Sequence, residues 1–131
     1  MKALSLRPYW ATEMLCGNKT IECRAWKTDY RGDLIICSSA KREPGCISGH
    51  ALLICKLVSI EPFTKKHLKQ AGMEEMPEKP SYAWILDDMR VIYPVPVKGK
   101  LHLFDLDIAP TVIPESISDE ELCAIFDPLY A

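Results

Sequence analysis

The sequence predicts a single α+β domain, built on a compact β-barrel of about six strands with two or three short helices. Segments of strand length with alternating or continuous apolar character dominate the 131 residues, and only short segments carry residues that start and end helices. A small, mostly β chain closes most easily into a barrel, because closure removes exposed sheet edges. The composition, 48% hydrophobic and 26% charged, is typical of a globular protein.

The first quarter of the chain predicts a strand, a helix and a second strand. Residues 3–6 form a short apolar segment. Pro8 and Gly17 are then placed as residues that begin and end a helix. Residues 20–26 alternate between apolar and polar side chains, which is typical of a half-buried strand.

The remaining elements follow from similar patterns. Thr64 is placed to cap a short helix that ends at Gly72, and Ser118 with Glu121 forms a capping box for a terminal helix. Further strands are expected at residues 33–38, 49–60, 82–86, 91–93 and 101–108. Pro94 and Pro96 cannot lie in a central strand, so we expect an edge or a crossing loop there.

Charge and cysteine content exclude several classes of function. A net charge of −2 gives no general attraction to nucleic acid, so any site for a polyanion must be a local basic pocket. No apolar run is long enough for a transmembrane helix, and the first residues do not resemble a signal peptide, so we expect no membrane association and a cytoplasmic location. The six cysteines are expected to be free thiols. They show no C-x-x-C spacing, so we expect no metal site and no cofactor.

The stretch GNKTIECRAW places Lys19, Glu22 and Arg24 within six residues. One interpretation is a solvated strand face with a weak ion pair, which contributes about 0–1 kcal/mol. Trp10 and Trp26 favour another, because aromatic rings beside cations and a carboxylate suit a planar ligand that forms hydrogen bonds. A base can stack on a tryptophan and be read by the carboxylate, while a phosphate meets a cation.

Other residues are candidates with equally plausible structural roles. Ser38 and Lys41 follow a buried strand at the end where barrel clefts open, so they are candidate ligand contacts or caps of loop amides. Trp84 lies on a predicted strand and is either a stacking platform or a core aromatic. Arg90 and Lys98 either extend a basic rim or are simply solvated.

The segment GNKTIECR fits the Gly-x-Lys-x-x-Glu-x-Arg signature of the ASCH domain, a relative of the PUA RNA-binding fold. The blocks LSLRPYWATEMLCGNKTIECRAW, YRGDLIICSSAK and YAWILDDMRVIYPVPVKGKLHLFDL resemble this family in the same order. We therefore predict an ASCH domain at residues 1–109, followed by a C-terminal extension with a short helix at residues 110–131. The resemblance implies a PUA-like barrel with a cleft between barrel and first helix, lined by the signature residues.

For function, the resemblance implies binding of RNA or of a modified nucleoside. Some ASCH proteins are hydrolases, either ribonucleases or an amidohydrolase of N4-acetylcytidine in which the signature lysine acts as base and a threonine matching Glu22 is the nucleophile. This chain lacks that threonine, so Lys19 and Glu22 are catalytic candidates only as an acid/base pair acting on water. Three hypotheses follow: a binding module, a hydrolase acting on RNA or nucleosides, and an interaction domain with a vestigial pocket.

Overall fold

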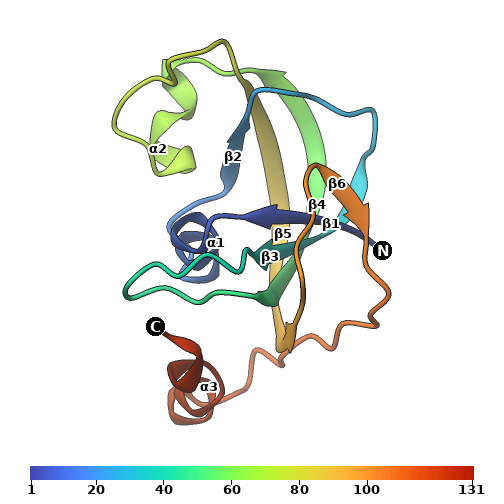
Figure 1. Cartoon of the computed structure of the whole chain (residues 1–131), viewed down its shortest axis with the longest axis vertical. Helices are drawn as coiled ribbons and strands as arrows, with labels where there is room; N and C mark the ends of the chain where they lie inside the picture. Colours follow the sequence, from blue (N-terminus) through green and yellow to red (C-terminus); the bar gives the residue numbers. More distant parts are fainter.

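A six-stranded, curled sheet forms the frame of the protein (Figure 1). The computed structural model describes residues 1–131, and the strand order is β2-β5-β4-β3-β1-β6. The strands are β1 (Lys2–Leu6), β2 (Ile21–Arg24), β3 (Gly32–Ser38), β4 (His50–Pro62), β5 (Tyr82–Pro96) and β6 (Leu103–Asp105). The helices are α1 (Pro8–Leu15), α2 (Leu68–Ala71) and α3 (Asp119–Phe126), with 3-10 turns at Lys65–His67 and Asp127–Leu129. This confirms the predicted α+β class. None of the helices has both the length and the apolar character needed to span a bilayer.

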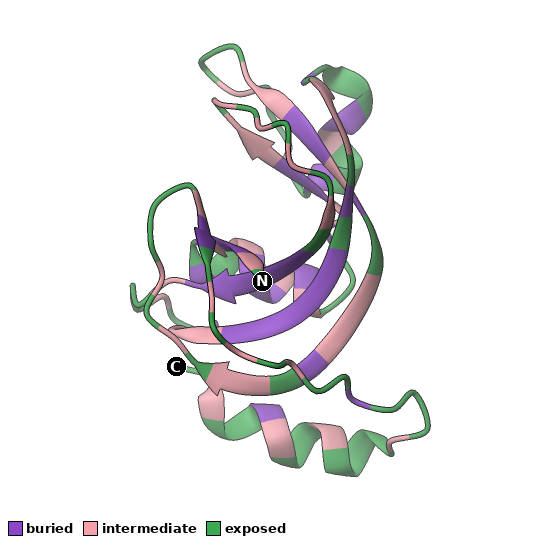
Figure 2. Ribbon diagram, turned by 90° about the vertical axis from the view of Figure 1, so that its right-hand side faces the viewer, coloured by how far each residue is buried: buried purple, intermediate pink, exposed green.

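The sheet curls because its two longest strands bend. The register between β4 and β5 shifts three times along their antiparallel pairing, and such irregularities bend a strand and increase its twist. Figure 2 shows these strands arching, with buried residues concentrated along the middle of the sheet. The sheet remains a half-barrel, with β2 and β6 as its two edges.

Strand β5 is longer than the sequence indicated. The two predicted strands at residues 82–86 and 91–93 are parts of one continuous strand, because β4 pairs with both. Asp88, with a φ of 52°, lies between them and marks the irregularity that broke the sequence pattern. Pro94 and Pro96 lie at the far end of this strand, beyond the part that pairs with β2, as expected for prolines at an edge.

The last strand is shorter than predicted, because only Leu103–Asp105 pairs with β1. His102, the residue just before β6, has a φ of 59°, which is not extended backbone, so the strand cannot begin earlier. The preceding segment, residues 97–102, is therefore a loop.

Helix α1 and the C-terminal segment cover the main core. Met14 of α1 packs in this core, as do Ile113 and Phe126 of the C-terminal segment. The Ser118 side chain accepts a hydrogen bond from the Glu121 backbone N–H at 3.1 Å, which is the predicted cap of α3.

Candidate ligand-binding cleft

A cavity of about 690 Å³ opens beside the edge strand β2. One side is formed by β1, the start of α1 and β2, and the other by the loop at residues 97–102 between β5 and β6. Its lining includes Ser5, Arg7, Trp10, Lys19, Glu22, Cys23, Arg24, Ser39, Ala40, Met73 and Lys98–His102. The volume lies within the roughly 300–1,000 Å³ of typical small-molecule sites. We call this cavity the cleft.

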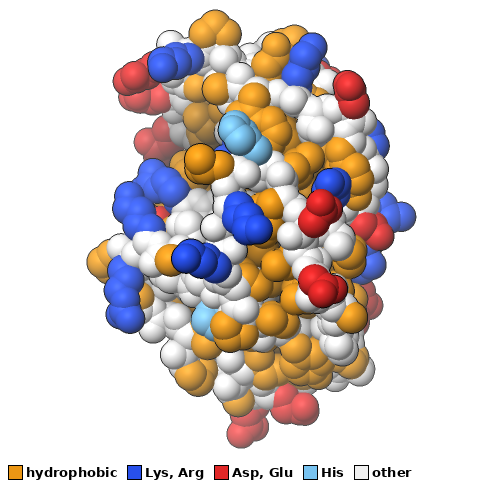
Figure 3. Space-filling model, turned by 45° about the vertical axis from the view of Figure 1, so that its right-hand side comes forward, with side chains coloured by type: hydrophobic (Ala, Val, Ile, Leu, Met, Phe, Trp, Pro, Cys, Tyr) orange, Lys and Arg blue, Asp and Glu red, His pale blue; other side chains and the backbone are white.

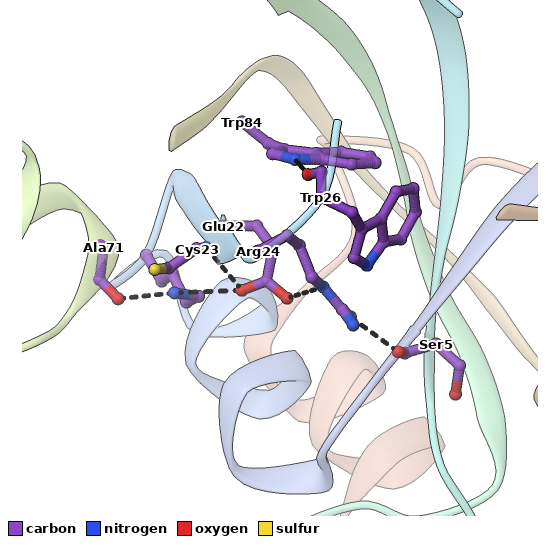
Figure 4. A network of polar contacts seen from close by, with 8 residues as sticks. Ser5, Glu22, Cys23, Arg24, Trp26, Ala71 and Trp84 are labelled. Atoms are coloured by element: carbon purple, nitrogen blue, oxygen red, sulfur yellow. Dashed lines mark hydrogen bonds and ion pairs between the residues drawn. The ribbon is translucent and has the colours of Figure 1, made fainter. Parts of the chain in front are cut away.

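Glu22 is the centre of a charged network at the base of the cleft (Figure 4). Its carboxylate is almost completely buried, although β2 is an edge strand. One oxygen lies 3.4 Å from the Lys19 Nζ and accepts the Cys23 backbone N–H at 3.2 Å. The other oxygen accepts the Arg24 Nε–H at 2.9 Å. Donors of the protein itself therefore contact both carboxylate oxygens.

Lys19 is 2% exposed, which is unusual for a lysine. Gly17 ends α1 with a φ of 82°, and the chain then turns so that Lys19 enters the interior. The Lys19 Nζ donates to the Ala71 carbonyl at 2.6 Å and lies 4.5 Å from the centroid of the Trp10 ring. Burial lowers the pKa of Lys19, and the charge of Glu22 opposes this effect.

Arg24 is the member of the network that remains accessible. Its side chain is 23% exposed, whereas the side chains of Lys19 and Glu22 are 1% and 6% exposed. Its Nη2 donates to the Ser5 carbonyl at 2.9 Å, which joins β2 to β1 on one side of the cleft. The interpretation as a solvated strand face is therefore wrong for Lys19 and Glu22.

Four of the seven candidate ligand residues from the sequence line the cleft: Trp10, Lys19, Glu22 and Arg24. Ser38 is fully buried, and its hydroxyl bonds to the backbone of His50. Lys41 is exposed on the loop just after the lining residue Ala40, outside the lining itself.

Trp84 also lies outside the cleft, in the main core. Its indole N–H donates to the Trp26 carbonyl at 3.1 Å, and the two rings pack edge to face at 4.8 Å. Arg90 pairs with Asp33 and Asp88 and is not part of the cleft wall.

The loop at residues 97–102 supplies the part of the site that sequence reasoning missed, apart from Lys98. His102 packs edge to face on Trp26, with ring centroids 4.8 Å apart. Lys98 and Lys100 flank Gly99, whose backbone approaches β1 so closely that a Cβ there would lie 2.4 Å from the Ser5 Oγ. The signal in the sequence was the Lys-Gly-Lys triplet, but nothing local shows that it faces β2.

We expect Gly99→Ala to displace this loop and to weaken ligand binding without unfolding the domain. The added methyl group requires the Ser5 hydroxyl or the loop itself to move. Gly45→Ala is a control at another loop glycine, which lies outside the cleft, where nothing lies within 4 Å of an added Cβ and φ is +74°. Chemical shifts of Lys98–His102 measured by NMR should change in Gly99→Ala, and unchanged shifts would show that the contact is not tight.

The charge of the cleft differs from that of the whole protein. Five Lys or Arg side chains line it, namely Arg7, Lys19, Arg24, Lys98 and Lys100, against the single carboxylate of Glu22. The whole chain has a net charge of −2. The cleft is therefore a local basic pocket, which the composition required of any polyanion site.

Two kinds of chemistry are disfavoured in the cleft, namely attack by a thiolate and binding of a metal ion by clustered acidic, His or Cys side chains. Burial raises the pKa of the Cys23 thiol, so this cleft residue is held in its protonated, weakly nucleophilic form. The structure shows no group of three or more His, Cys, Asp or Glu side chains arranged to hold a metal ion. The lining also contains five cations, the Trp10 ring, the buried Glu22 carboxylate, two serine hydroxyls and the His102 imidazole.

Comparison with known proteins identifies the family and agrees with the fold. The family model of the ASCH domain matches residues 4–96. Two single-substitution variants of the ASCH protein from Zymomonas mobilis have similar structures, with TM-scores of 0.63 and 0.64 and 17% sequence identity to this chain. Each match covers 80% of this chain, and the two matches cover 88% and 87% of the Zymomonas mobilis chains. The unsubstituted Zymomonas mobilis protein matches with a TM-score of 0.60 and 17% identity, and this match covers 99% of this chain and 95% of the Zymomonas mobilis chain. No curated protein matches the chain. The chain belongs to the ASCH domain family.

Proposed function

We propose that this ASCH domain binds RNA or a modified nucleoside, with a base held in the cleft. The observation that carries the proposal is the excess of five cationic side chains over one carboxylate around a single cavity, in a protein with a net charge of −2. Phosphate groups supply the matching negative charge. Membership of a family related to RNA-binding folds supports the same class of ligand.

The network around Glu22 supports a division of roles in the cleft. Arg24 is held by Glu22 and Ser5 through Nε and Nη2, so its position is set before a ligand arrives. A guanidinium fixed in this way suits hydrogen bonding to a base edge or a phosphate. Trp10 lines the cleft and is partly exposed, which offers apolar contact to a base. Lys19 is buried at the base of the cleft and contributes positive charge there without being exposed to solvent.

A hydrolase acting on RNA or nucleosides is the second candidate function. The lowered pKa of Lys19 favours it, because a larger fraction of the lysine is then unprotonated and able to accept a proton. Against it, Glu22 has both oxygens engaged by Lys19, Arg24 and Cys23, whereas a general base acting on water needs an oxygen within reach of that water. We therefore place binding ahead of hydrolysis.

We expect Arg24→Ala and Lys19→Ala to weaken binding of a short single-stranded RNA, and the loss to shrink as salt concentration rises. Both residues act mainly through charge, which salt screens. Fluorescence anisotropy with a labelled RNA measures this. Lys56→Ala is a control for the loss of one positive charge, because Lys56 is exposed on β4, outside the cleft and without an ion pair. An equal loss in Lys56→Ala would contradict a site in the cleft.

Turnover separates the two candidate functions. Wild-type protein incubated with N4-acetylcytidine or RNA is expected to give no product. Measurable turnover that falls by roughly 10²–10⁴ in Glu22→Gln, with affinity preserved, would make Glu22 a general base and the protein a hydrolase.

A further inference from the structure

We infer that the cleft takes a nucleotide from within an RNA strand, with phosphates on both sides of the bound base, and that Lys98 and Lys100 contact those phosphates. The inference rests on the proposed function and narrows its ligand. It follows from which cations around the cleft already have acidic partners and which do not.

The cations on the β1–α1–β2 side of the cleft are partly neutralised within the protein. Lys19 and Arg24 share the carboxylate of Glu22. Arg7 pairs with Glu43 at 2.6 Å. Lys19 and Arg24 together therefore leave about one positive charge to a ligand.

The opposite wall is different, because Lys98 and Lys100 form no ion pair and are exposed at the cavity. A neutral nucleoside leaves both ammonium groups without a partner. A ligand with two or more phosphates supplies negative charge both for Lys98 and Lys100 and for the one positive charge left on Lys19 and Arg24. Free nucleosides therefore use only part of the charge that the cleft presents.

The loop that carries these lysines is held in place. Val97 donates its backbone N–H to the Gly49 carbonyl at 2.9 Å, and Gly49 donates to Ser39 at 2.9 Å. At the other end of the loop, Gly99 packs against β1 and His102 against Trp26. The two lysines are thus presented by an anchored wall.

The basic surface continues beyond the cavity. Lys41 and Arg42 are exposed, form no ion pair, and directly follow Ser39 and Ala40 of the cleft lining. The hydrogen bonds from Val97 to Gly49 and from Gly49 to Ser39 bring their loop next to the one that bears Lys98. In Figure 3, several Lys and Arg side chains lie close together on the left and centre of the face drawn there, and others are scattered along its top and right edges. A strand leaving the cleft finds further cations on this path.

The test compares cytidine, cytidine 3′,5′-bisphosphate and a short mixed-sequence single-stranded RNA, each titrated into wild-type protein and into Lys98→Ala/Lys100→Ala. The matched control is Lys56→Ala/Lys65→Ala, which removes two exposed lysines that neither line the cleft nor form ion pairs. Titrations at about 50 and 200 mM salt give the dependence of affinity on ionic strength.

We expect the bisphosphate and the RNA to bind wild-type protein more tightly than cytidine does. For RNA, losing two phosphate contacts should reduce the slope of log affinity against log salt by about 1.4. Over a fourfold change in salt, wild-type protein should then lose about sevenfold more affinity than Lys98→Ala/Lys100→Ala. Cytidine affinity should be the same in all three proteins.

Cytidine binding as tight as that of the bisphosphate and RNA, or an RNA slope unchanged in Lys98→Ala/Lys100→Ala, would overturn this inference and leave the proposed function intact. An equal slope change in Lys56→Ala/Lys65→Ala would also overturn it. Failure of wild-type protein to bind any of the three probes would instead overturn the proposed function.

Discussion

Replacing Glu22 by glutamine is expected to lower the free energy of unfolding by about 3–5 kcal/mol. Glu22 lies between Lys19 and Arg24, and the side chains of Lys19 and Glu22 are 1% and 6% exposed. Without the carboxylate, Lys19 loses its negatively charged partner and keeps only neutral ones, namely the Ala71 carbonyl, the Trp10 ring and the amide oxygen of the new glutamine. Removal of one partner from a buried ion pair is costly because the other charge remains desolvated. Urea denaturation followed by tryptophan fluorescence measures the change.

A second substitution tests the cause of this loss. Lys19→Met removes the stranded charge and keeps a side chain of similar length, so Lys19→Met/Glu22→Gln should be more stable than Glu22→Gln alone. The double-mutant cycle should give a coupling of about 0.5–3 kcal/mol between the two residues. Additive effects, or a loss below about 1 kcal/mol in Glu22→Gln, would show that Lys19 and Glu22 do not form a charged pair in the folded protein.

Trp84→Ala is expected to lower the free energy of unfolding by about 3–5 kcal/mol. Trp84 is 0% exposed and belongs to the main core, so its removal leaves a large cavity. The substitution also removes the hydrogen bond to the Trp26 carbonyl and the ring on which Trp26 packs. Because Trp26 in turn supports His102 at the cleft, the loss should reach the cleft indirectly. Thermal and urea unfolding of the purified variant give the magnitude.

Trp84→Phe separates a core role from ligand stacking. Phenylalanine keeps an aromatic ring in the core and loses the hydrogen bond, which should cost roughly 0.5–1.5 kcal/mol for the bond, with any packing loss added. RNA affinity should stay within about twofold of wild type, a difference of less than 0.5 kcal/mol, because the ring lies outside the cleft lining. A variant that is as stable as wild type but binds RNA tenfold more weakly would instead make Trp84 a ligand contact.

Local patterns in the sequence determined the elements around the cleft. Pro8 and Gly17 bound α1 as expected, and Gly17 takes the positive φ that turns the chain toward Lys19. Alternation over residues 20–26 predicted the short strand that carries Glu22 and Arg24. The sequence also predicted the cap of α3, in which Ser118 accepts a hydrogen bond from the Glu121 backbone N–H. These features depend on backbone preferences and side-chain periodicity within a few residues, which a sequence records directly.

Only the tertiary structure decided what faces each of these elements. Alternation shows which residues of a strand share a face, but whether that face is covered depends on the register and curl of the whole sheet. Thus Trp84 is in the core, and β5 is one strand because β4 pairs along its full length. The Ala71 carbonyl that holds Lys19 is 52 positions away along the chain. The loop of Lys98 to His102 contacts Ser5 of β1 and Trp26 just after β2, each more than 70 residues earlier in the chain. Contacts between segments so distant leave no periodic signal, because they depend on how the β4–β5 pair bends and where the loops at its ends are anchored.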